Sequence, residues 1–212
     1  MEAIKKMWTV LFVMGMIPFC ICSGQEILKR KKVIIIDPGH GGIDSGAIAI
    51  NGHQEKDLVL EIAKEILKWN KMGLNNRYDI YLTRYTDTLI SLSDRAKLVN
   101  LLRSDIFISL HGNNANNPNA KGIEVYIHNS VHAQRQSVKI AVYIMEQLNE
   151  KLGYKIRGVK KANFQVLRQT VNTCPAILIE LGFLSNKDEA NYLINKENKN
   201  AVALAILMSI KI

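Results

Sequence analysis

VIIIDPGHGG, from Val33 to Gly42, is the stretch of the 212-residue sequence that decides the fold. Its first four residues are apolar and β-branched, a pattern typical of a strand that is buried on both faces. The glycines and the proline that follow exclude both helix and strand, so we expect His40 on a loop at the carboxyl end of this strand. In open α/β sheets, functional sites gather at that edge.

Strand patterns alternate with helix patterns over the rest of the chain. Besides Val33–Ile36, apolar or alternating runs predict strands at 79–83, 106–110, 123–127, 165–167 and 176–181. Apolar residues at helical spacing predict helices at 55–73, 91–103 and 132–152, and one or two helices within 188–210. Residues 158–163 are expected to form a basic loop. The alternation predicts a single α/β domain with about six strands and helices on both faces of the sheet.

Residues 1–24 have the pattern of a signal peptide. Two lysines precede an uncharged run from Met7 to Cys22, and small residues before Gln25 suit cleavage there. We therefore expect export to the periplasm or cell envelope, with residues 25–212 as one folded domain. A lipoprotein or an uncleaved anchor is the alternative. The apolar run is short for a membrane-spanning helix, which needs about 20 residues, so we expect no stable span in the mature chain.

The charge and cysteine content narrow the classes of partner. The formal net charge of +9 suits an anionic partner such as a wall polymer, or serves solubility alone. No aromatic-rich basic stripe suggests base stacking, so we expect no nucleic acid partner. Two of the three cysteines fall in the N-terminal segment, which leaves Cys174 without a partner for an internal disulfide. We expect a monomer whose stability comes from its hydrophobic core, with Cys174 as a small core residue.

Three residues are candidate metal ligands. His40 and His111 each follow a predicted buried strand, and Glu55 opens the first predicted helix. Two imidazoles and a carboxylate are the ligand set of many catalytic zinc sites, which leave one coordination position open for water. Taken singly, a loop histidine is usually a surface residue, and Glu55 is an ordinary first-turn acid favoured by the helix dipole. His53, two residues before Glu55, is a weaker candidate for the same site.

Glu180 interrupts an otherwise apolar strand. A carboxylate in such a position needs either a partner or a function, since burying an unpaired charge is costly. Close to a metal, it can take a proton from water and pass it to a leaving amine. A salt-bridged strand end is the alternative reading of the same residue.

Several motifs together carry a resemblance to a known family. They are VIIIDPGHGGIDSGA, the following Glu55, YLTRYTDTLISLSDRAKLVN, DIFISLHGNN, KGIEVYIHN, FQVLR and PAILIELGFLSN. In this order, from Val33 to Asn186, they resemble the zinc-dependent N-acetylmuramoyl-L-alanine amidases of the AmiA/AmiB/AmiC type.

This resemblance implies a zinc ion bound by His40, Glu55 and His111, with Glu180 as the catalytic glutamate. It implies peptidoglycan as the partner and hydrolysis of the amide between the lactyl group of N-acetylmuramic acid and L-alanine. It also implies a twisted, mostly parallel sheet, and residues 25–212 would form the catalytic domain. Export fits a cell-wall hydrolase.

The resemblance also suggests roles for residues outside the metal cluster. Arg84, Asp87 and Arg95 match family positions without a metal role, and Arg95 is expected to pair with an acid. We predict substrate contacts for Asn113, Arg157 and Lys160, where the basic residues either meet carboxylates of the stem peptide or form a solvated face.

The sequence departs from the family in two respects. Gly112 stands where the family often has alanine, which loosens the loop without removing a ligand. The segments between His111 and Glu180 are too short for the site-blocking helix of some members, so we expect an open site. Any activator protein is unknown.

Two other functions remain open. The first is a zinc peptidase or carboxypeptidase that acts on another peptide bond of the wall, because the ligands fix the reaction type better than the substrate. The second is a non-catalytic wall-binding regulator on the same fold, which predicts loss of at least one of His40, Glu55, His111 and Glu180. All four are present.

Overall fold

The computed structural model describes residues 30–130 and 134–210. The predicted signal peptide at 1–24 lies outside these residues. The strands are β1 (Val33–Pro38), β2 (Asp79–Leu82), β3 (Ile106–Asn113), β4 (Ile123–Ile127), β5 (Ile156–Lys161) and β6 (Ala176–Phe183). The helices are α1 (Glu55–Met72), α2 (Leu92–Leu101), α3 (Gln134–Leu152), α4 (Gln165–Thr170), α5 (Lys187–Ile194) and α6 (Lys196–Met208).

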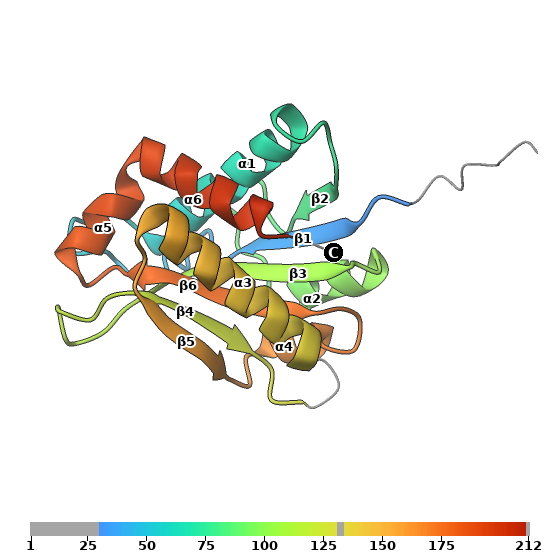
Figure 1. Cartoon of the computed structure of the whole chain (residues 1–212). Coiled ribbons are helices and arrows are strands. Elements are labelled where there is room, and N and C mark those ends of the chain that lie inside the picture. The colour runs from blue at the N-terminus through green and yellow to red at the C-terminus, as the bar shows by residue number, and fades with distance from the viewer. Residues whose placement is uncertain (1–29, 131–133, 211–212) are drawn as a thin grey trace, which may run out of the picture. The chain divides into compact units, whose positions relative to one another are not determined.

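The six strands form one sheet in the order β2-β1-β3-β6-β4-β5 (Figure 1). Every neighbouring pair is parallel except β4 and β6, which run antiparallel. This confirms the prediction of a mostly parallel sheet. The continuous apolar runs of β1, β3 and β6 occupy its centre, as expected for strands covered on both faces.

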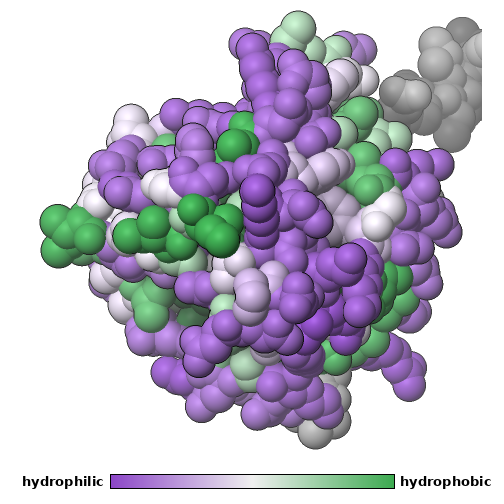
Figure 2. Space-filling view, turned by 90° about the vertical axis from the view of Figure 1, so that its left-hand side faces the viewer, coloured by the Kyte–Doolittle hydropathy of each residue, from purple (hydrophilic) through white to green (hydrophobic). Residues whose placement is uncertain are grey.

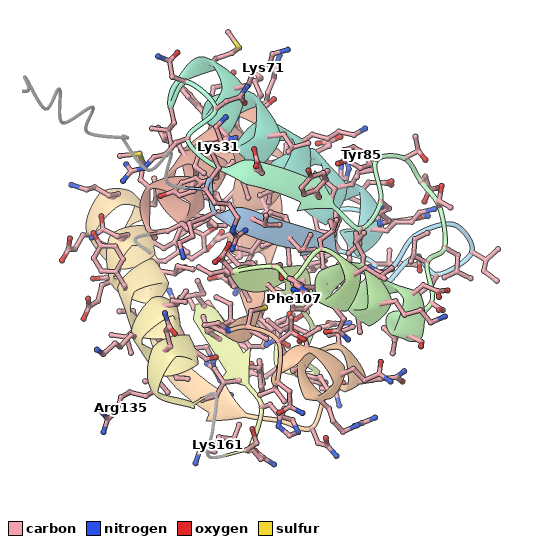
Figure 3. The ribbon with its side chains drawn as sticks, turned by 90° about the vertical axis from the view of Figure 1, so that its right-hand side faces the viewer. Lys31, Lys71, Tyr85, Phe107, Arg135 and Lys161 are labelled. Carbon is pink, nitrogen blue, oxygen red and sulfur yellow. The ribbon has the colours of Figure 1, made fainter. Side chains whose placement is uncertain are left out.

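Helices cover both faces of the sheet, as the sequence predicts. On one face, α1, α3, α5 and α6 pack their apolar residues in the larger core cluster, around Ile62, Ile144 and Ile206. On the other face, the shorter α2 and α4 form a smaller cluster with Phe107 of β3, seen near α2 in Figure 3. In Figure 1, α3 and α6 lie in front of the sheet and α2 lies behind it.

The strand predicted at 165–167 is wrong, because these residues open helix α4. Its buried residues, Val166, Leu167 and Thr170, recur at helical spacing, and the Thr170 hydroxyl donates to the carbonyl of Val166 at 2.7 Å. A window of three residues is too short to separate this period from that of a strand.

The basic loop predicted at 158–163 is also wrong over most of its length. Residues Ile156–Lys161 form β5, which pairs with β4 and ends the sheet. The sequence suggests a loop here because Gly158, with φ of 108°, and the surrounding cations are uncommon in a buried strand. Both features suit an edge strand, where charged side chains discourage pairing with another chain.

The carboxyl ends of the three central strands meet at one edge of the sheet. Pro38 of β1 lies opposite Leu110 of β3, and His111 of β3 lies opposite Glu180 of β6. The loop that begins after Pro38 therefore starts beside His111. This register brings residues that are far apart in the sequence to the same edge.

A buried ion pair ties this edge to helix α2. An Arg95 guanidinium nitrogen lies 2.7 Å from the Asp37 carboxylate, and both side chains are almost completely buried. The same carboxylate accepts hydrogen bonds from the hydroxyls of Thr83 at 2.6 Å and Ser109 at 2.7 Å. The expectation that Arg95 pairs with an acid is confirmed.

Arg95→Met is expected to lower the free energy of unfolding by about 3–5 kcal/mol, because it leaves the buried Asp37 charge without its cation. Urea titration followed by circular dichroism measures the loss. Lys97→Met, on the same helix, removes an exposed pair with Asp94 and should change stability little. Equal losses in the two variants would contradict this account of Asp37.

Candidate metal centre

His40, Glu55 and His111 converge on one point. His40 Nε2 lies 3.0 Å from Glu55 Oε1, and His111 Nδ1 lies 2.9 Å from the same oxygen. One donor atom from each residue lies within 4.8 Å of the other two. The three residues come from the loop after β1, the start of α1 and the end of β3. The predicted grouping is thus present in the fold.

The loop holds His40 in an unusual backbone conformation. His40 has φ of 59°, in the left-handed region that non-glycine residues rarely adopt. Arg95 donates to the carbonyl of His40 at 2.6 Å, and the Asp44 carboxylate lies 2.9 Å from His40 Nδ1. Such a carboxylate fixes the orientation of an imidazole and directs its other nitrogen toward the metal position.

Two glycines let the loop close around the cluster. A Cβ atom at Gly39 would lie 2.3 Å from the His111 ring, and one at Gly46 would lie 2.5 Å from Glu55 Oε2. Both distances are too short for any side chain. Gly39 of the DPGHGG stretch and Gly46 shortly after it therefore serve close packing around the cluster.

Backbone donors orient the Glu55 carboxylate, which is 3% exposed. Ala47 N–H donates to its Oε2 at 2.8 Å, and Gly112 N–H donates to its Oε1 at 3.0 Å. Burial opposes its ionisation, but the hydrogen bonds with His111 and His40 hold the pKa of Glu55 well below its usual range. In turn, although burial opposes it, the bonds to Glu55 and Asp44 raise the pKa of His40 to about 9.

The donor set fits a zinc ion. Two imidazoles and one ionised carboxylate are ligands that zinc prefers, and they lie close enough to share one cation. The carboxylate charge between the two rings already attracts positive charge, as the raised pKa of His40 indicates. The hydrogen bonds to Asp44, Ala47 and Gly112 hold the His40 and Glu55 side chains in place before any ion binds.

Glu180 faces the same cavity as the two histidines. The cavity has a volume of about 660 Å³ and is lined by His40, His111 and Glu180, among others. Glu180 Oε2 is buried and has no hydrogen-bond partner among the described residues. Burial raises the pKa of Glu180 to about 7, with His111 opposing the rise. The alternative of a salt-bridged strand end is not supported, since no ion pair joins Glu180 to another described residue.

Apolar residues line much of the remaining wall of this cavity, beside polar residues such as Asp94 and Gln165. The apolar residues come from the loop before α2, from α4 and its cap, and from β6, and they are Leu89, Ile90, Leu92, Phe164, Val166 and Leu178. Figure 2 views the molecule from the side at which β1 and β3 end, and apolar side chains protrude on the left of this face. Exposed apolar residues in or beside the bordering loops are Ile43, Leu89 and Leu92. The site is open to solvent along this flank.

The three predicted substrate contacts meet around a residue that the sequence does not single out. Asn113 donates to Glu124 Oε2 at 3.0 Å, while Arg157 and Lys160 each donate to Glu124 Oε1 at 2.6 Å. The Tyr126 hydroxyl also donates to Glu124 Oε2, at 2.8 Å. Glu124 is 2% exposed. Arg157 and Lys160 are therefore paired with a buried carboxylate, although their own side chains keep access to solvent.

Asp44 and Glu124 are the two site residues that the sequence analysis leaves unassigned. Asp44 follows His40 by four residues in a glycine-rich loop, a spacing that fits a carboxylate–histidine pair. Glu124 occupies an alternate position in a short strand, where a solvent-facing acid is the usual reading. His53, the weaker candidate, is exposed and absent from the metal-type cluster. Cys174 is buried, as expected for a core residue, and burial raises the pKa of its thiol to about 11.

A family model described as N-acetylmuramoyl-L-alanine amidase matches residues 34–211. The chain belongs to this family. The match spans the whole sheet and all the residues of the site. It agrees with the resemblance carried by the sequence motifs.

Individual relatives support the family assignment. The endolysin of Bacillus phage SPP1 is 40% identical over 181 residues, which cover 82% of this chain and 62% of the endolysin. The N-acetylmuramoyl-L-alanine amidase LytC of Bacillus subtilis is 34% identical, over 95% of this chain and 40% of LytC. The chain thus spans less than two thirds of the length of these curated amidase-family relatives.

A solved amidase structure has the same fold. The crystal structure of the N-acetylmuramoyl-L-alanine amidase from Clostridium difficile 630 superposes with a TM-score of 0.78 and 35% sequence identity. The superposition covers 85% of this chain and 95% of that one. It confirms the α/β fold predicted for this amidase-family chain.

Glu124→Gln is expected to destabilise the amidase domain in a pH-dependent way. Burial opposes ionisation of Glu124, but the bonds from Lys160, Arg157 and Tyr126 lower its pKa from 4.5 to about 2. Because the folded-state pKa is depressed, the ionised carboxylate stabilises the fold above pH 4.5, and this contribution disappears as the pH falls toward 2.

The gap in unfolding free energy between the wild type and Glu124→Gln should therefore be widest at neutral pH and shrink below pH 4.5. Urea titrations at pH 7, 5 and 3 (roughly spanning this window) measure it. Glu146→Gln, at an exposed position of α3, serves as a control with little expected effect. A gap that stays constant across the series would contradict the ionised state assigned to Glu124.

Proposed function

We propose that this protein is a zinc-dependent N-acetylmuramoyl-L-alanine amidase that hydrolyses the amide between N-acetylmuramic acid and the L-alanine of the stem peptide in peptidoglycan. One observation carries the proposal. His40 and His111, which converge with Glu55, border the same cavity as Glu180, a buried carboxylate whose Oε2 has no described partner. Family membership supplies the substrate class.

The proposed zinc ligands are His40 through Nε2, Glu55 through Oε1, and His111 through an imidazole nitrogen. When bound, zinc polarises the scissile carbonyl and lowers the pKa of a coordinated water to about 7. Asp44 orients the His40 ring, and the backbone donors of Ala47 and Gly112 orient Glu55. These contacts keep the ligands in position between turnovers.

Glu180 is the proposed general base and then the general acid. Its Oε2 takes a proton from the attacking water and delivers it to the nitrogen of the leaving L-alanine. A pKa of about 7, raised by burial, suits a carboxyl group that both accepts and donates a proton near neutrality.

The proposed place of action is the cell envelope. Cleavage after residue 24 would release the domain outside the cytoplasmic membrane, where peptidoglycan lies. Within residues 30–130 and 134–210, no helix has the length and apolar character required to span a bilayer. The open flank of the cavity supports substrate access without an activator protein. A requirement for an added activator would contradict that part of the proposal.

Digestion of purified peptidoglycan tests the function directly. Products are separated and identified by mass spectrometry. Free stem peptides that begin with L-alanine, together with peptide-free glycan, are expected. Cleavage within the stem peptide would instead indicate a zinc peptidase or carboxypeptidase, and binding without products would indicate a wall-binding regulator.

Glu180→Gln is expected to bind zinc as the wild type does but to lose at least about a hundredfold in kcat, because the amide cannot move the proton. Zinc content by atomic absorption and release of stem peptides measure the two properties. A variant that kept most of its rate would remove Glu180 from the proposed role.

Gly39→Ala is expected to weaken zinc binding about tenfold or more, since the added methyl would lie 2.3 Å from the His111 ring and displace it. Competition with a chromogenic chelator measures the affinity. Gly153→Ala is the control, because Gly153 lies away from the cluster with nothing near its Cβ position, so any loss there reflects backbone strain alone. Equal zinc affinity in Gly39→Ala and the wild type would contradict the assignment of His111 as a ligand.

A further inference from the structure

A charged region adjoins Glu180 on the same face of the sheet. Glu124 of β4 lies directly opposite Glu180 of β6 in the antiparallel register, so the two side chains point to the same side. Tyr126, two residues further along β4, packs edge-on against Phe164, with 5.3 Å between ring centroids. Since Phe164 lines the cavity, this region is continuous with the candidate active site.

Two cations gather on one carboxylate oxygen in this region. Arg157 Nε and Lys160 Nζ both lie 2.6 Å from Glu124 Oε1. With Glu124 ionised, the cluster carries two positive charges and one negative charge, a surplus of one positive charge. Internal neutralisation of Glu124 would need only one cation. The surplus charge points to an anionic ligand.

The two cations keep access to solvent, unlike their partner. The side chains of Arg157 and Lys160 are 33% and 41% exposed, whereas the Glu124 side chain is 3% exposed. An ammonium group has three N–H donors and the contact with Glu124 uses one. Lys160 therefore has donors available to a bound molecule.

The spacing fits the peptide side of the proposed substrate. The two cationic groups lie at the Glu124 carboxylate, which is one strand away from Glu180, or about 4.8 Å in the sheet. An extended peptide advances by roughly 3.3–3.6 Å per residue. A carboxylate carried by the residue after L-alanine can therefore lie near Arg157 and Lys160 while the scissile amide lies at Glu180.

We propose that Arg157 and Lys160, positioned by Glu124, form a carboxylate subsite that selects stem peptides whose second residue carries a free carboxylate. This inference rests on the proposed amidase function and names the substrate class within it. A carboxamide at the same position offers no charge to the surplus cation. The subsite thus distinguishes the acid form of the second residue from its amidated form.

Kinetics with two matched substrates test the subsite. Both are N-acetylmuramoyl-L-alanyl-D-glutamate derivatives with the glutamate linked through its γ-carboxyl group, and they differ only in a free or an amidated α-carboxyl group. The wild type is expected to prefer the free acid by about tenfold in kcat/KM, mainly through KM, as a charge-assisted hydrogen bond of this kind provides.

Lys160→Met should bring this preference close to 1, and Lys160→Arg should restore most of it. Lys161→Met is the control, because Lys161 pairs in register with Ile127 on the other face of the sheet and lies at the lower margin of Figure 3. It should keep the wild-type preference. A wild type without preference, or a Lys160→Met variant that retains it, would overturn the subsite.

A binding measurement separates failure of the subsite from failure of the amidase function. Titration calorimetry compares the free-acid and amidated forms of L-alanyl-γ-D-glutamate on the zinc-loaded protein, without any turnover. Tighter binding of the free acid that Lys160→Met abolishes would support the subsite even if neither muramoyl substrate were hydrolysed. Hydrolysis of both substrates with equal binding of both peptides would leave the amidase function intact and refute the subsite.

Discussion

The carboxylate of Asp37 is buried where β1 ends, and the geometry of the site depends on the partners that pair with it there. An ionised group in the interior is costly unless it is paired and fully hydrogen-bonded. Arg95 of α2, Thr83 after β2 and Ser109 of β3 together supply these bonds. Because the three partners come from three elements, Asp37 is satisfied only when those elements have assembled around β1.

The same arginine extends this constraint into the loop that carries His40. Arg95 donates to the carbonyls of Pro38 and His40, and Arg84 donates to the carbonyls of Gly39 and Lys56. The bonds to Gly39 and His40 satisfy acceptors of the loop, and together these contacts hold His40 at its positive φ. The stability of this edge and the position of the first imidazole thus depend on one set of hydrogen bonds.

Around the cavity, three glutamates differ because their surroundings differ. Glu55 lies between two imidazoles and backbone donors, which keep it ionised. Hydrogen bonds from two cations and a tyrosine hydroxyl lower the pKa of Glu124 and so favour its ionised form. Glu180 Oε2 has no hydrogen-bond partner among the described residues, and burial raises the pKa of Glu180 to about 7. One residue type therefore supplies a metal-ligand candidate, an anchor for cations and the proposed proton carrier at one edge of the sheet.

The order of the functional segments could be read from the sequence. Apolar runs predicted the central strands, and the glycine-rich stretch after Ile36 predicted a loop at a strand end. Since parallel strands place their carboxyl ends at one edge, the grouping of His40, His111 and Glu180 followed from pattern alone. The short segments were harder to predict from the sequence. Residues 165–170 are too few to show a helical period, and the cations of β5 are not typical of a strand.

The sequence by itself determined the central strands, the glycine-rich loop and the identity of the candidate ligands, because these depend on neighbours along the chain. Only the tertiary structure decided the surroundings of the charges. Arg157 and Lys160 lie 33 and 36 residues from Glu124 along the chain. No local sequence pattern therefore predicts that all three share one hydrogen-bonded cluster. A carboxylate becomes buried only when the sheet has assembled. Its partners are then the residues that lie near it in space, whatever their distance along the chain.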